Sequence, residues 1–91
     1  MTAERNALLD AIRAVENSQE AKEMRARLSA IAGRLGEAEG GAEIAEIAED
    51  LERTRRVLRK NRGLDALYGL QAKTLLEEAE FRRTGRRVVI D

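Results

Sequence analysis

The chain has 91 residues, with 17 basic and 17 acidic side chains and neither Cys nor His. Without Cys there is no disulfide framework or thiolate metal site, and without His the commonest metal ligand and general base is missing. The composition therefore excludes zinc chemistry and hydrolytic triads, and we predict no cofactor. No apolar run approaches the roughly 18 residues that cross a bilayer, and the N-terminus lacks the apolar core of a signal peptide. We expect a cytosolic protein with no membrane contact.

The composition is typical of long helices and coiled coils. Pro is absent, charged residues make up 37% of the chain, and Ala, Glu, Arg and Leu dominate. We predict an all-α fold in which a long helix is followed by a helical hairpin, three helices in total. Residues 1–85 form a single helical oligomerisation domain in this prediction, and residues 86–91 form an extended C-terminal tail.

The first predicted helix covers residues 3–35, because nothing stronger than Asn17-Ser18 interrupts the helical pattern before Gly36. A kink or break at Asn17-Ser18 is the alternative. Small and apolar residues recur along this segment at alternating spacings of four and three, which is the spacing of a heptad seam. In the first half of the seam these residues are alanines, which allow close approach of another helix.

The second predicted helix starts near Ala42, after the flexible connection GEAEGG. Its apolar residues Ile44, Ile47, Leu51 and Leu58 lie three, four and seven positions apart, with Thr54 at the missing heptad position. We expect this helix to stop at Asn61-Arg62-Gly63, where basic residues precede a glycine. The third predicted helix runs from about Leu64 to Thr84, where Gly85 stops it.

These apolar stripes are long and narrow, and the chain has only two aromatic residues. We therefore expect them to be too narrow to be buried within one copy, and the leading hypothesis is a self-associating structural or adaptor protein without enzymatic activity. The predicted oligomer interface combines both seams. It consists of Ala7, Ala11, Ala14, Leu28, Leu35, Ile44, Ile47, Leu51 and Leu58.

The tail contains the β-branched triplet Val88-Val89-Ile90, directly after a helix stop. A strand of this length is not stable alone. Two interpretations are open: the tail is disordered, or it pairs with another subunit or with the sheet edge of a protein partner.

Charge is segregated along the second predicted helix. Residues 37–52 contain seven acidic and no basic side chains, and residues 53–62 contain six basic and no acidic ones. This pattern suits the helix dipole and allows i,i+4 ion pairs such as Glu49 to Arg53. In a hairpin, the basic end of the third helix would also return beside Glu43, Glu46 and Glu49, and two antiparallel copies of the second helix would set the same blocks against each other.

Two arginine clusters suggest a second function, contact with nucleic-acid phosphates or with an acidic partner. A nucleic-acid-associated oligomer such as a phage-type small terminase subunit is the concrete alternative. The zero net charge and the scarcity of aromatic side chains count against it. The candidate contact residues are Arg53, Arg55, Arg56, Arg59, Arg82, Arg83, Arg86 and Arg87.

The segment GLDALYGLQAKTLLEEA is similar to the start of the last helix of the AroQ chorismate mutases. This resemblance implies an intertwined helical dimer with one long and two shorter helices, in which Arg and Lys side chains clamp a dicarboxylate. The second predicted helix here begins AEIAEIAED, with no basic residue before Arg53. The implied clamp is therefore incomplete, and no catalytic residue is assigned.

Overall fold

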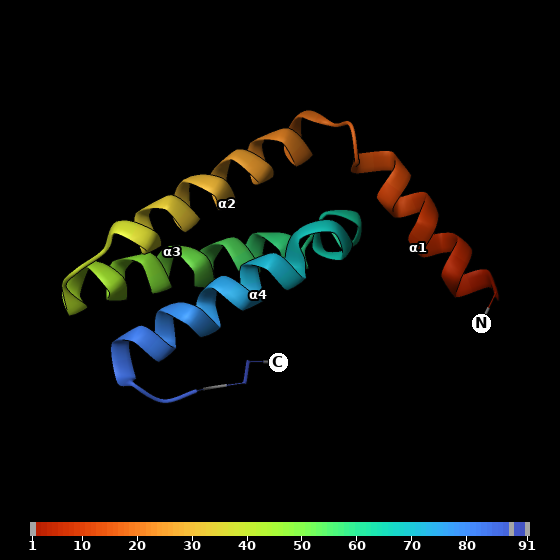
Figure 1. The fold of residues 1–91 in the computed structure, drawn as a ribbon. Coiled ribbons are helices and arrows are strands. Elements are labelled where there is room, and N and C mark those ends of the chain that lie inside the picture. The colour runs from red at the N-terminus through yellow and green to blue at the C-terminus, as the bar shows by residue number, and fades with distance from the viewer. Residues whose placement is uncertain (1, 88, 91) are drawn as a thin grey trace.

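The computed structural model describes residues 2–87 and 89–90 and consists there of four α-helices without a strand (Figure 1). The helices are α1 (Thr2–Val15), α2 (Gln19–Glu37), α3 (Gly41–Arg59) and α4 (Arg62–Thr84). The prediction of an all-α chain is confirmed. The predicted number of three helices is wrong, because the first of them is divided in two. None of the helices in the described part of the chain is long and apolar enough to cross a membrane.

Ser18 divides the predicted first helix by bonding to both of the resulting helices. Its hydroxyl donates to the carbonyl oxygen of Val15 at 2.6 Å and accepts from the backbone N–H of Ala21 at 3.2 Å. Short polar side chains compete in this way with the helical hydrogen-bond ladder, and Ser is a favoured N-cap. The break at Asn17-Ser18, the alternative to a continuous helix, is therefore what the chain adopts.

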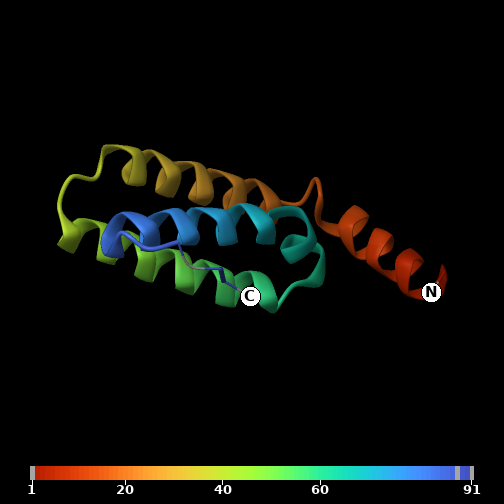
Figure 2. The ribbon, with the colours of Figure 1, turned by 60° about the horizontal axis from the view of Figure 1, so that its bottom comes forward.

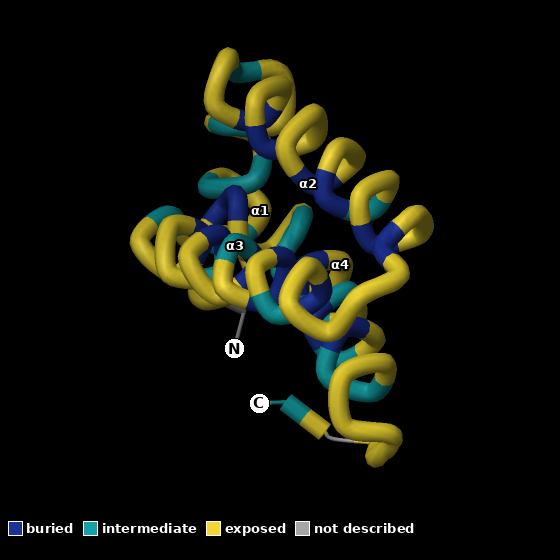
Figure 3. The backbone as a smooth tube through the Cα atoms, turned by 90° about the vertical axis from the view of Figure 1, so that its left-hand side faces the viewer, coloured by how far each residue is buried: buried dark blue, intermediate teal, exposed yellow. Residues whose placement is uncertain are grey.

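Helices α2, α3 and α4 pack into a three-helix body, in which α3 runs antiparallel to the other two (Figures 1 and 2). Their buried residues lie on the sides that face one another (Figure 3). Thr54, at the missing heptad position, is fully buried and donates its hydroxyl to the carbonyl oxygen of Asp50 at 2.8 Å. This bond satisfies the hydroxyl inside the core.

The core of this body contains most of the residues that we predicted to face a second copy. The stripes are buried within one copy because three helices, and not two, surround them. The buried residues from that prediction are Leu28, Leu35, Ile44, Ile47, Leu51 and Leu58.

Gly63 lies in the first turn of α4, where the sequence had predicted the end of a helix. Helix α3 ends at Arg59, and the Asn61 side chain accepts a hydrogen bond from the N–H of Leu64 at 3.1 Å, so Asn61 caps α4. A Cβ atom added to Gly63 would overlap the carbonyl oxygen of Ala11 and lie 2.7 Å from Cγ2 of Val15. The predicted break between the two helices is thus confirmed to within about two residues, but Gly63 does not make the stop and instead serves the close approach of α1.

The C-terminal end of α4 matches the prediction. Gly85 has φ 75°, a left-handed conformation that glycine adopts without strain, and ends the helix after Thr84. Beyond it, Ile90 packs half-buried against the core, and its N–H donates to Oε2 of Glu77 at 3.0 Å. The described part of the tail thus lies against its own chain (Figure 2), whereas Val88 falls outside the described residues.

Helix α1 projects from the three-helix body (Figures 1 and 2). The molecule measures 45 × 27 × 16 Å, with a radius of gyration of 14.5 Å, whereas a compact domain of this length has about 12 Å. Its accessible surface of 6261 Å² exceeds the value expected for a folded monomer of this mass by roughly 950 Å². The extended shape therefore leaves more surface in water than the chain length requires.

Candidate functional site

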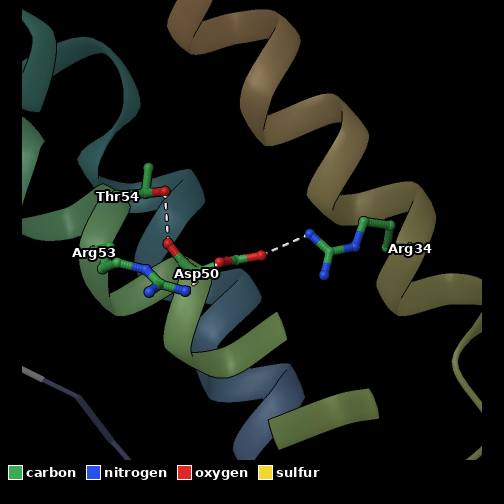
Figure 4. Close-up of polar contacts among 4 residues, drawn as sticks. All are labelled: Arg34, Asp50, Arg53 and Thr54. Carbon is green, nitrogen blue, oxygen red and sulfur yellow. Dashed lines mark hydrogen bonds and ion pairs between the residues drawn. The ribbon is translucent and has the colours of Figure 1, made fainter. Parts of the chain in front are cut away.

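The α2–α3 hairpin is held in register by Asp50. One of its carboxylate oxygens lies 2.7 Å from Nη1 of Arg34 on α2, and the other lies 2.6 Å from Nη2 of Arg53 on α3 (Figure 4). The hydrogen bond from Arg34, followed by the one from Arg53, holds the pKa of Asp50 below its usual value. Two turns further from the connecting loop, this register brings Arg27 of α2 opposite Val57 of α3.

A surface hollow of about 560 Å³ lies at that point between α2 and α3. Its lining consists of five cationic side chains and one valine and contains no carboxylate. We call it the cationic hollow; its residues are Arg27, Arg53, Arg56, Val57, Arg59 and Lys60.

The cations of the cationic hollow differ in how they are held. Arg53 is bound to Asp50. In contrast, Arg27, Arg56 and Lys60 are exposed and have no ion-pair partner among the residues that the structure describes. The hollow is therefore a region of concentrated positive charge in a chain whose net charge is zero.

A second groove, of about 500 Å³, lies between α3 and α4 and has mixed charge. There, Arg83 pairs with Glu80 at 2.6 Å, and this hydrogen bond raises the pKa of Arg83 above its ordinary value. Because Glu52 and Glu80 lie among its four arginines, the groove is less suited to an anion than the cationic hollow. It is lined by Glu52, Arg55, Arg56, Arg59, Leu76, Glu80, Arg83 and Ile90.

The predicted arginine clusters, residues 53–59 and residues 82–87, therefore lie side by side only in part. Arg83 shares this groove with three members of the first cluster. Arg82 instead donates to the carbonyl oxygens of Leu35 and, at 2.6 Å, Ala38. Arg87 lies over the Phe81 ring, 4.5 Å from its centroid, and Arg86 is exposed.

Helix α4 returns antiparallel to α3, as predicted (Figures 1 and 2), but Glu43, Glu46 and Glu49 form no ion pair with it among the described residues. Arg82 turns instead toward the end of α2, where the carbonyl oxygens of Leu35 and Ala38 accept its guanidinium protons.

Helices α1 and α4 also carry exposed leucines. Leu67 and Leu70 follow Gly63 at i+4 and i+7, so the side of α4 that receives α1 continues as leucine. Leu67 is 38% exposed and Leu70 is 76% exposed, and on α1 Leu9 is 41% exposed. We call these three exposed leucines together the α1/α4 apolar surface; Leu9 lies on a different side of α1 from Ala11, which meets Gly63. Of the predicted interface, Ala7 and Ala14 are also exposed and Ala11 is half-buried.

Sequence reasoning missed Arg27 because the positive charge was counted in blocks along one helix. Arg27 belongs to a segment of mixed charge and joins the basic half of α3 only through the hairpin register. The pair Arg34 and Asp50 carries a signal for that register, since a short loop places residues 34 and 50 on facing turns. Once this pair is fixed, Arg27 lies beside the basic block.

The arginine clamp implied by the AroQ resemblance is absent from the described part of the chain. Thr54 is the only buried polar side chain there, and every described arginine is exposed or half-buried. No group of three or more described acidic side chains is placed to hold a metal ion. No protein-family model, curated protein or solved structure matches this chain significantly.

Proposed function

We propose that the protein is a helical self-associating module whose copies meet through α1 and the α1/α4 apolar surface. The observation that carries this proposal is the projection of α1 from the three-helix body while leucines on both helices remain exposed (Figure 1). An adaptor role would follow from bringing several copies of one surface together. The interface proposed here therefore lies at the end of the molecule, whereas the sequence had predicted it along the apolar stripes that form the core.

The surface area supports an interface of ordinary size. The excess of roughly 950 Å² over a compact monomer is close to the approximately 800 Å² that each partner buries in a standard protein interface. Fully burying a completely exposed leucine contributes about 1.5–3 kcal/mol. Leu70, which is 76% exposed, would contribute most of this value, and Leu9, which is 41% exposed, less than half of it.

A second copy of the chain fits this surface better than a charged partner does. The exposed charged residues of α1 are Glu4, Arg5, Asp10 and Arg13, two of each sign, distributed around the helix. A two-fold interface sets a surface against itself, so a patch of balanced charge avoids like-charge repulsion.

Light scattering during size-exclusion chromatography tests the proposal. At micromolar concentration we expect a mass of at least twice 10.2 kDa for the natural sequence. Leu9→Glu and Leu70→Glu should each reduce it to that of the monomer, because a carboxylate buried at an apolar interface must be desolvated.

Val57→Glu is the matched control, since Val57 has a similar exposure of 43% but lies on the cationic hollow. It should leave the mass unchanged. The proposal fails if the natural sequence is a monomer, or if Val57→Glu dissociates the assembly as effectively as Leu9→Glu. Circular dichroism of each variant shows whether its helices are retained.

A further inference from the structure

The cationic hollow plays no part in the proposed self-association, and it has the features of a binding site of its own. We propose that it binds the phosphate backbone of duplex nucleic acid without reading the base sequence. This inference does not depend on the oligomeric state, because all the residues of the hollow come from one copy.

The charge of the hollow points to a polyanion. Five cations share one depression of about 560 Å³ without a lining carboxylate, and three of them lack an ion-pair partner in the described part of the chain. Side chains of like charge held this close repel one another, and an anion with several closely spaced charges relieves that repulsion. The acidic half of α3 does not reach the site, except for Asp50, which is bound to Arg34 and Arg53.

The shape of the hollow favours an extended ligand over a small one. Arg27, Arg56 and Lys60 surround an exposed valine and do not converge on an enclosed point. Along α3, the step from Arg53 to Lys60 corresponds to about 10 Å at 1.5 Å per residue. That length matches roughly three base-pair steps of 3.4 Å along one strand.

Charge density distinguishes nucleic acid from an acidic protein segment. Duplex DNA presents one negative charge about every 1.7 Å of its axis, whereas a helical peptide would need an acidic side chain at almost every residue to equal this. Four of the five cations are arginines, whose planar fork matches phosphate oxygens. The lining contains no aromatic side chain for stacking on unpaired bases, which favours contact with the duplex backbone.

Fluorescence anisotropy with a labelled duplex of mixed sequence tests this site over a salt series from about 50 to 200 mM. The test variant combines Arg27→Ala, Arg56→Ala and Lys60→Ala, which removes three cations without breaking a described ion pair. We expect its affinity to fall at least about tenfold at the lowest salt concentration. The slope of log affinity against log salt should become shallower by about two to three.

The matched control combines Lys22→Ala, Arg25→Ala and Arg86→Ala. It removes the same two arginines and one lysine in number and type, from exposed positions on α2 and just after α4 that belong to neither proposed surface. Its affinity should change less than twofold if the hollow is the site. Thermal melting by circular dichroism establishes that both triple variants remain folded.

Three results would overturn the proposal. One is no binding by the natural sequence at about 50 mM salt, and another is an equal loss in both triple variants, which would indicate general charge attraction. The third is competition by polyglutamate as effective, per unit of charge, as competition by unlabelled duplex, which would identify an acidic protein segment as the partner.

Discussion

Asp50 shows how a single carboxylate fixes the hairpin on which the cationic hollow depends. It receives Arg34 from α2 and Arg53 from its own helix, and the carbonyl oxygen of the same residue accepts the buried hydroxyl of Thr54 (Figure 4). Because both arginine side chains are about half exposed, solvent screens these pairs and their contribution to stability is small. Their larger effect is on the register, which places Arg27.

The lowered pKa of Asp50 predicts a pH-dependent stability. The folded-state pKa lies below the unfolded value of about 3.8, so the stabilisation is present above that value and is lost as the pH falls through the folded-state pKa. We therefore expect Asp50→Asn to lower the free energy of unfolding by less than about 1 kcal/mol at pH 7. Urea denaturation should show that difference shrinking as the pH falls below about 3.8.

Glu49→Gln is the control for this measurement, because Glu49 is exposed and forms no ion pair among the described residues. It should change the unfolding free energy by no more than a few tenths of a kcal/mol at either pH. A difference between Asp50→Asn and the natural sequence that persists undiminished at low pH would contradict the role assigned to these ion pairs.

At the scale of the elements, the docking of α1 on α4 depends on a missing side chain. Gly63 brings the backbone of α4 against the carbonyl of Ala11 and the side chain of Val15. We expect Gly63→Ala to lower the free energy of unfolding by about 1–3 kcal/mol, because the added methyl group forces the two helices apart.

Gly33→Ala provides the opposite expectation in the same assay. Gly33 lies inside α2, and nothing is within 4 Å of a Cβ atom added there. Since Gly is a poor helix former, this change should stabilise the protein by up to about 1 kcal/mol. If Gly63→Ala were also neutral or stabilising in denaturant titrations, the close contact of α1 with α4 would be refuted.

A helix boundary could be predicted from the sequence where one residue alone sets it. It could not be predicted where the same residue type serves another purpose, such as a close contact between helices. Gly85 ends α4 as predicted, since its left-handed conformation is the ordinary helix stop. Gly63 has the same local sequence signal, but it serves a contact with α1, more than 45 positions away. Ser18 was predicted as a weak interruption, and it breaks the helix because its hydroxyl satisfies groups of both α1 and α2.

At the scale of the whole molecule, the apolar periodicity predicted which residues are buried but not what covers them. Leu28, Ile47, Leu51 and Leu58 belong to the predicted stripes and are completely buried. A heptad pattern is the same whether the covering helix comes from the same chain or from another copy. The break at Ser18 decides the matter, because it lets α2 return over α3 and α4 while α1 docks on the start of α4 and projects beyond the three-helix body (Figure 1).

The two proposed surfaces together predict avidity. If copies join through α1, each assembly presents more than one cationic hollow, and a long duplex can occupy two of them at once. We therefore expect Leu9→Glu to weaken binding to a long duplex by at least about tenfold. Binding to a duplex of about one helical turn, roughly 10 base pairs, should be unchanged, as measured by anisotropy with both lengths.

An equal loss of affinity for the long and the short duplex would show that Leu9→Glu damages the hollow itself. No loss of affinity for either duplex would show that the copies do not bind one duplex together. Comparison with the Arg27, Arg56 and Lys60 triple variant separates the cases, since that variant should lose affinity for both lengths.

Arg82 links the C-terminal part of α4 to the end of α2. Its guanidinium donates to two carbonyl oxygens at the end of α2, one of them 44 positions earlier in the chain. The turn between α2 and α3 is thereby closed by a residue of α4. We therefore expect local opening of that turn to release the last turns of α4 as well, so that hydrogen exchange of these distant segments is coupled.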